Sequence, residues 1–113
     1  MKELNHYKVL HFDDYPILYK GENESGRQVI GSFMEEENDN LIKYIEGVVD
    51  YNTYAMFMDN TINYLEVLES AIELFIIERD IENIELSRKQ IDFKDIPQDC
   101  LPNTNSFISK LKL

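Results

Sequence analysis

Two apolar runs separated by a polar turn constrain the fold of this chain more than any other feature. Residues 16–20 read P-I-L-Y-K and residues 28–34 read Q-V-I-G-S-F-M, with E-N-E-S-G-R between them at 22–27. β-Branched and aromatic residues favour strands, and a short polar turn that closes with a glycine, here Gly26, favours a hairpin. The sequence therefore predicts two paired antiparallel strands in this part of the chain.

Further strands are expected on both sides of this hairpin. Residues 7–12 read Y-K-V-L-H-F and precede a turn at Asp13 and Asp14, and residues 41–48 read L-I-K-Y-I-E-G-V. Residues 72–78 return to strand character, and residues 82–91 can pair with them as a last hairpin. The acidic stretch that begins at Glu35 is interpreted as a loop between two strands.

Residues 50–71 change to a helical pattern. Asp50 is a suitable N-cap for a short helix over 51–58, and Asn60 can adopt the left-handed conformation that ends it. Thr61 can cap a second helix over 62–71, whose inward positions would be Ile62, Leu65, Leu68 and Ala71. The predicted fold class is α+β: one small domain with an antiparallel sheet of five to six strands and two short helices inserted in the middle.

The length of 113 residues is typical of one domain, so we expect residues 1–113 to form a single unit with an irregular tail over 94–113. The N-terminus lacks the apolar core of a signal peptide, and the longest apolar runs have four residues, against about 20 needed to cross a bilayer. One cysteine, Cys100, suits a reducing compartment. A soluble, cytoplasmic protein is expected.

Several stretches carry a resemblance to a known family. D-D-Y-P-I-L-Y-K at 13–20, the turn with Gly26, N-T-I-N-Y-L-E-V-L at 60–68 and L-P at 101–102 together resemble a family of small uncharacterised prokaryotic domains of unknown function. The resemblance covers most of the chain and lies in hydrophobic positions and turns. It implies a fold, and it implies neither an activity nor any site residues.

The charge is unbalanced. The chain has 22 acidic and 11 basic residues, a net charge of −11, and residues 35–60 alone hold seven acidic residues against one basic residue. A field of this sign repels nucleic acid and anionic membranes and attracts basic surfaces. Direct binding of nucleic acid or of a membrane is therefore not expected, and a basic protein is the expected partner.

Motifs for metal binding and catalysis do not stand out. A twelve-residue calcium loop that starts at Glu35 would place Asn40 where a glycine is needed and Lys43 at a ligand position. His6 and His11 lie five residues apart, so on a strand they would point to opposite faces. Cys100 follows Asp99, whose charge would raise the pKa of the thiol. No metal, no cofactor and no catalytic residue is predicted, and an enzyme is not expected.

We therefore interpret the acidic middle of the chain as a docking face for a basic partner. Tyrosines accompany the acids there and are favoured at interfaces. The hypothesis is a small inhibitor or neutraliser that acts by occlusion, of the phage anti-defence or toxin-immunity type, with a nuclease or other nucleic-acid-handling protein as partner and nucleic-acid mimicry as one form. The predicted partner-binding residues are Glu35, Glu36, Glu37, Asp39, Glu46, Asp50, Tyr51, Tyr54, Asp59, Glu66, Glu69 and Glu73.

Two alternatives stay open. A small-molecule or nucleotide-sequestering module would need an apolar pocket with a few polar groups, and the bases outside the acidic segment, Arg27, Arg79, Arg88 and Lys89, could serve it. An accessory structural subunit would instead use an exposed strand edge to pair with a larger assembly.

Overall fold

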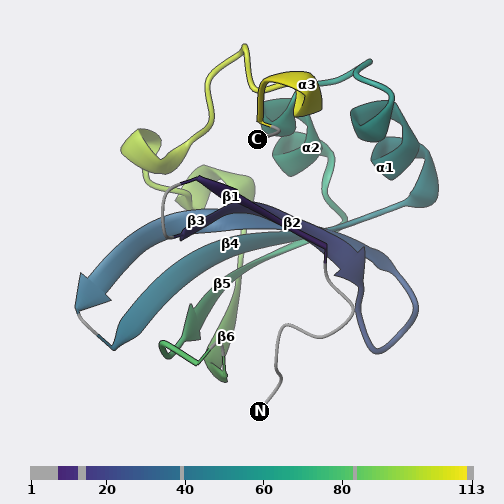
Figure 1. The fold of residues 1–113 in the computed structure, drawn as a ribbon. Helices are drawn as coiled ribbons and strands as arrows, with labels where there is room; N and C mark the ends of the chain where they lie inside the picture. The colour runs from purple at the N-terminus through teal and green to yellow at the C-terminus, as the bar shows by residue number, and fades with distance from the viewer. Residues whose placement is uncertain (1–7, 13–14, 39, 83, 112–113) are drawn as a thin grey trace.

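The computed structural model describes residues 8–12, 15–38, 40–82 and 84–111 and contains one antiparallel sheet of six strands (Figure 1). Each strand pairs with the next along the chain, so the strand order in the sheet is β1-β2-β3-β4-β5-β6. Short connections join all neighbours except β4 and β5. The strands are β1 (Lys8–Phe12), β2 (Tyr15–Glu22), β3 (Gln28–Asn38), β4 (Leu41–Val49), β5 (Glu73–Arg79) and β6 (Glu85–Ile91).

Two helices, α1 (Tyr51–Met58) and α2 (Tyr64–Ser70), connect β4 to β5 and lie together over one face of the sheet (Figure 1). The chain after β6 returns over the same face through two single turns of 3-10 helix, η1 (Phe93–Asp95) and η2 (Gln98–Cys100), and a short helix, α3 (Ile108–Leu111). This arrangement confirms the predicted α+β fold with two helices inserted between strands.

The main hydrophobic core lies between the sheet and this helical layer. Leu18, Ile30 and Ile45 project from neighbouring strands towards the buried side chains of Phe57 and Leu68. The C-terminal segment also contributes, because Ile96 and Ile108 are both buried in this core. The segment that the sequence predicts to be irregular therefore contains short helical turns and closes one side of the core.

A second, smaller cluster lies on the opposite face of the sheet. Tyr19 of β2 and Tyr44 of β4 are buried there with their ring centroids 5.8 Å apart in an edge-to-face arrangement, and Phe33 packs against them. Side chains alternate between the two faces along a strand, so each central strand supplies both clusters. The sheet is therefore buried on both faces at its centre.

The limits of α1 agree with its sequence signals. The Asp50 side chain accepts a hydrogen bond from the Thr53 amide at 2.7 Å, which confirms it as the N-cap. Asn60 has a φ of 72°, which confirms the predicted left-handed residue after the helix.

The predicted start of the second helix is wrong. Asn63, not Thr61, is the N-cap of α2, because Asn63 and Glu66 form a reciprocal capping box. The Thr61 hydroxyl instead donates to Asp59. The helix begins at Tyr64, so its buried face is formed by Tyr64, Val67 and Leu68.

The predicted loop after residue 34 is also wrong, because β3 continues to Asn38. Its last residues pair with β4 through two register irregularities, between Phe33 and Glu35 and between Glu36 and Asn38. Backbone pairing does not depend on side-chain charge, and the bulges let the exposed carboxylates turn to solvent. Most of the acidic stretch is therefore strand. Asp39 lies outside the described residues.

Candidate docking surface

The predicted partner-binding residues separate into three sets. Glu35 and Glu36 are exposed near the end of β3; the Glu37 side chain and Asp39 lie outside the described residues. Glu46 is fully buried. The remaining residues lie on or next to the two helices: Asp50, Tyr51, Tyr54, Asp59, Glu66, Glu69 and Glu73.

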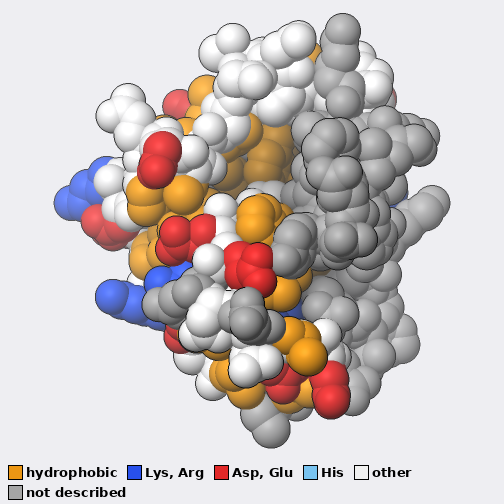
Figure 2. Space-filling view, turned by 60° about the vertical axis from the view of Figure 1, so that its left-hand side comes forward, with side chains coloured by type: hydrophobic (Ala, Val, Ile, Leu, Met, Phe, Trp, Pro, Cys, Tyr) orange, Lys and Arg blue, Asp and Glu red, His pale blue; other side chains and the backbone are white. Residues whose placement is uncertain are grey.

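The first and third sets lie at opposite ends of β4. Glu36 pairs with Ile42 near the start of β4, whereas Asp50 follows the last residue of that strand. A nine-residue strand is about 30 Å long, so the two acidic sets do not merge into one patch. Figure 2 shows one face of the molecule, on which acidic side chains lie dispersed among hydrophobic and basic ones.

A basic neighbour offsets part of the charge at the end of β3. Glu35 and Lys43 are direct partners in the β3–β4 register, and their side chains form an ion pair at 3.8 Å. About half of the Glu35 side chain is exposed, so this pair contributes less than about 1 kcal/mol to folding. It nevertheless lowers the local negative field at this end of the sheet.

A second group of carboxylates lies on and beside the two helices. We call it the acidic helix surface, and within the described part of the chain none of its carboxylates forms an ion pair with a lysine or arginine. The sequence between Lys43 and Arg79 contains neither basic residue type. The acidic helix surface consists of Asp50, Asp59, Glu66, Glu69 and Glu73.

Apolar groups accompany these carboxylates. Tyr51 is 73% exposed and Ile72 is 52% exposed, and the Ile72 amide donates to the Val48 carbonyl at 2.7 Å. That bond places Ile72 close to the end of β4 and hence to the start of α1. Tyr54 is half-buried and holds Lys20 of β2 over its ring at 5.8 Å. The surface therefore combines negative charge with large side chains that a partner could cover.

Three of the five carboxylates also stabilise the helices. Asp50 and Glu66 accept hydrogen bonds from backbone amides at the helix starts, and Asp59 accepts from Thr61 at the end of α1. Asp50 accepts hydrogen bonds from both the backbone amide and the side chain of Thr53, and these two bonds hold the pKa of Asp50 below its ordinary value. Glu69 and Glu73 form no hydrogen bond among the described side chains. Their charge has no such local role in the fold.

Glu46 is a correction to the predicted docking face. Its carboxylate is buried on the face of the sheet opposite the helices and accepts hydrogen bonds from two directions. The Tyr19 hydroxyl donates to Oε2 at 2.7 Å, and Arg88 donates through Nη1 to Oε1 at 2.9 Å. A side chain held in this way cannot contact a partner.

Gly31 makes this arrangement possible. Tyr19, Gly31 and Glu46 lie in register on three neighbouring strands. The Tyr19 ring covers the bare backbone of Gly31, and a Cβ built on Gly31 would overlap the ring. The phenol can therefore cross β3 and reach the carboxylate on β4.

Two arginines complete the cluster around Glu46. Arg79 is 1% exposed, lies 3.9 Å from the Glu46 carboxylate and sits 5.9 and 6.0 Å from the ring centres of Tyr19 and Tyr44. Burial raises the pKa of the Tyr44 phenol, and the charge of Arg79 partly opposes this shift.

Arg88 bridges the two acids of the cluster. It binds Glu85 through both Nε and Nη2, at 3.2 and 2.7 Å, in addition to Glu46. Burial alone would lower the pKa of Arg88, but its bonds to Glu85 and the charge of Glu46 outweigh burial and raise the pKa above its ordinary value. We call Tyr19, Glu46, Arg79, Glu85 and Arg88 the buried charge cluster.

This cluster bears on the alternative of a small-molecule or nucleotide-sequestering module. Arg79 and Arg88 do come together, as that alternative requires, but Glu46 and Glu85 balance their two positive charges. The cluster is neutral as a whole, so the net charge of −11 is carried by the rest of the chain. Because the two carboxylates already pair with both arginines, the cluster has little attraction for a phosphate, although Arg79 Nε is buried without a hydrogen-bond acceptor among the described residues.

The remaining sequence candidates lie apart from both sites. Burial raises the pKa of the Cys100 thiol, and the charges of Asp99 and Glu35 add to the shift, as the sequence predicts for Asp99. Among the described residues, no three His, Cys, Asp or Glu side chains gather closely enough to hold a metal ion. None of the described helices is long and apolar enough to cross a membrane.

No family model matches this chain, and no curated protein or solved structure matches it. The resemblance to small prokaryotic domains therefore stays a prediction, and the function must be argued from the residues.

Proposed function

We propose that this domain is a protein-binding inhibitor that docks its acidic helix surface on a basic partner and blocks it by occlusion. The observation that carries the proposal is the set of five carboxylates on and beside α1 and α2 that form no ion pair with a lysine or arginine of the described residues. A helix stabilised by its own surface charges normally alternates acids with lysines or arginines, because such pairs contribute a few tenths of a kcal/mol each. The absence of both residue types between positions 44 and 78 favours an external source of positive charge.

The exposed apolar side chains support the same surface. Binding energy at interfaces is concentrated in a few large side chains, and tyrosine is common among them. Tyr51 and Ile72 could fill this role, while the carboxylates around them would accelerate association and select a basic partner.

The proposed docking surface is smaller than the set of partner-binding residues predicted from the sequence. Glu46 has no part in it, and the acids near the end of β3 lie too far from α1 to act in the same contact. A partner that normally binds nucleic acid remains the preferred class, because such proteins present the basic surface that the helices would match. The inhibitor would act in the cytoplasm and without chemistry of its own.

A pair of charge-matched variants tests this proposal. The first replaces the acidic helix surface by amides, which keeps the capping hydrogen bonds: Asp50→Asn, Asp59→Asn, Glu66→Gln, Glu69→Gln and Glu73→Gln. The control removes five charges elsewhere: Glu35→Gln, Glu36→Gln, Glu82→Gln, Asp95→Asn and Asp99→Asn. Both proteins have the same net charge and differ only in where it was removed.

Each protein is immobilised and exposed to a lysate of the native host, and captured proteins are identified and assayed with and without the domain. We expect the wild type and the control to retain the same basic protein and to inhibit it, and the helix-surface variant to lose it. Equal capture by both variants would contradict the proposal, and so would capture without inhibition.

A further inference from the structure

A cavity between the sheet and the C-terminal segment is not used by the proposed docking surface. It has a volume of about 160 Å³ and lies where β2, β3, α2 and the segment after η1 meet. Figure 2 shows a hollow walled by hydrophobic side chains on this side of the molecule. The residues that line the cavity are Leu18, Ser32, Phe33, Tyr64, Cys100, Pro102 and Ser106.

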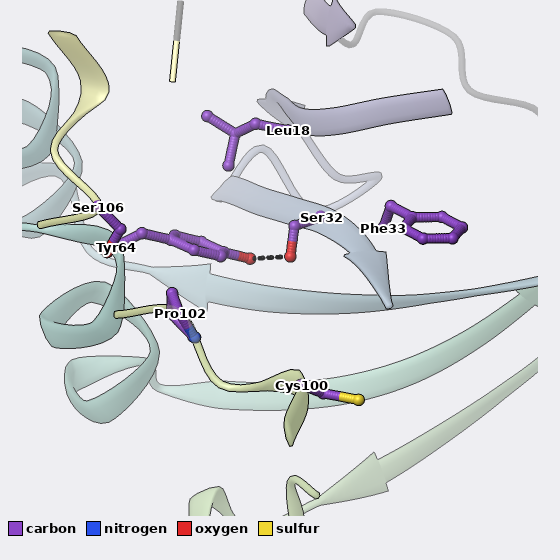
Figure 3. A pocket seen from close by; sticks show the side chains of 7 residues that line it. All are labelled: Leu18, Ser32, Phe33, Tyr64, Cys100, Pro102 and Ser106. Atoms are coloured by element: carbon purple, nitrogen blue, oxygen red, sulfur yellow. Dashed lines mark hydrogen bonds between the residues drawn. The ribbon is translucent and has the colours of Figure 1, made fainter. Parts of the chain in front are cut away.

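Its walls are mostly apolar. Figure 3 shows Leu18 on one side of the Tyr64–Ser32 pair and Pro102 and Cys100 on the other, with Phe33 beyond Ser32. Pockets that enclose drug-sized ligands have volumes of about 300–1,000 Å³, so this cavity is too small to enclose one. A dry apolar cavity of about 150 Å³ can hold benzene. The volume therefore selects a molecule of about one aromatic ring.

Two hydroxyls give the cavity a polar side. The Tyr64 hydroxyl donates to Ser32 Oγ at 2.8 Å, and within the described residues Ser32 takes part in no other side-chain hydrogen bond. Ser32 can therefore still donate its own proton. Ser106 Oγ donates to the Asn103 carbonyl at 2.7 Å and can still accept. A ligand with one hydroxyl can use either group.

We propose that this cavity binds a small neutral molecule consisting of one ring and a hydroxyl, with phenol as the simplest probe. The ring contacts Leu18 and Pro102, and the ligand oxygen accepts from Ser32. An anion is disfavoured, because the charges of Asp99 and Glu35 act at Cys100 in the cavity wall. The site does not depend on the docking surface, and either could exist without the other.

Cys100 supplies a direct readout, because it lines the cavity and is the one cysteine of the sequence. The rate of alkylation of Cys100 by iodoacetamide is measured at increasing phenol concentrations, with the unfolded protein in urea as a control for direct effects on the reagent. A ligand that covers the thiol slows the reaction by the factor 1 + [phenol]/Kd, which is about tenfold at ten times Kd. Benzoate, the anion of similar size, is titrated in parallel.

We expect saturable protection by phenol, little protection by benzoate, and amide chemical-shift changes confined to residues around Ser32, Tyr64 and Cys100. Cys100→Phe fills the cavity and should abolish the shift changes, whereas Leu86→Phe adds the same ring at an exposed position of β6 and should not. Should Cys100→Phe fail to fold, the wild-type titrations decide alone. Absent or unsaturable protection, equal protection by benzoate, or shift changes elsewhere would overturn the proposal.

Discussion

Tyr19 lies across the bare backbone of Gly31 and donates a hydrogen bond of 2.7 Å to the buried carboxylate of Glu46. The relationship joins three neighbouring strands and places a full negative charge between two arginines. Burying a charge is costly unless it is paired and hydrogen-bonded, and here each Glu46 oxygen has a donor. This cluster therefore specifies how the central strands align.

Gly31→Ala tests whether the Tyr19 ring must lie across Gly31 to reach Glu46. The added methyl group would displace the Tyr19 ring and break its bond to Glu46, so we expect a loss of about 2–3 kcal/mol in the free energy of unfolding, measured in urea. In a protein that already carries Tyr19→Ala, Gly31→Ala should change the free energy of unfolding very little, because the ring that the new methyl group would displace is absent. Additive losses in the double variant would show that the two residues do not interact.

Glu46→Gln tests the correction to the predicted docking face. The amide leaves the buried Arg79 and the half-buried Arg88 without a full counter-charge, and breaking a buried pair costs about 3–5 kcal/mol. Glu69→Gln, on the exposed side of α2, should change the free energy of unfolding by less than about 0.5 kcal/mol. Similar small effects of both substitutions would mean that Glu46 is not held as described.

The start of α2 can be tested in the same way. Asn63→Ala removes both the cap and its contact with the Thr104 carbonyl at 3.0 Å, and should cost about 1–2 kcal/mol. Thr61→Ala removes a hydroxyl at an exposed position and should cost less than about 0.5 kcal/mol. The reverse order of the two losses would restore Thr61 as the cap.

Acid should weaken the start of α1. The pKa of Asp50 is lowered in the folded state by its bonds to Thr53, so its contribution to stability is present above its ordinary value of 3.8 and is lost as the pH falls through the folded pKa. Asp50→Asn cannot titrate. The stability advantage of the wild type over this variant should be present at about pH 6 and shrink below about pH 3, measured by urea unfolding. If the difference in the free energy of unfolding between the wild type and Asp50→Asn does not change with pH, the pKa of Asp50 is not lowered in the folded state.

Much of the fold could be predicted because its signals are local. The Gly26 turn, the Asp50 cap and the left-handed Asn60 each depend on neighbouring residues, and the structure confirms the cap and the left-handed residue. The end of β3 and the N-cap of α2 were harder to predict from the sequence. The sequence offers two candidate caps, Thr61 and Asn63, and an acidic stretch can pair as a strand when its side chains face solvent.

The buried charge cluster could have been suspected in part. Along 41–48, Ile42, Tyr44, Glu46 and Val48 alternate onto one strand face, so an acid there stands among apolar positions. Its partners could not be identified, because Tyr19 and Arg88 are 27 and 42 residues away in the sequence. Only the register of the strands brings them together.

The docking proposal is tested most directly by the salt dependence of association with the captured basic partner. Association rate constants are measured by stopped flow at about 0.05 and about 0.5 M salt for the wild type, the helix-surface variant and the charge-matched control. The wild type and the control should slow steeply with salt, while the helix-surface variant should start slow and change little. If the association rates of both variants depend on salt to the same extent, association responds only to the net charge of the protein and not to where the carboxylates lie. The acidic helix surface is then not the docking site.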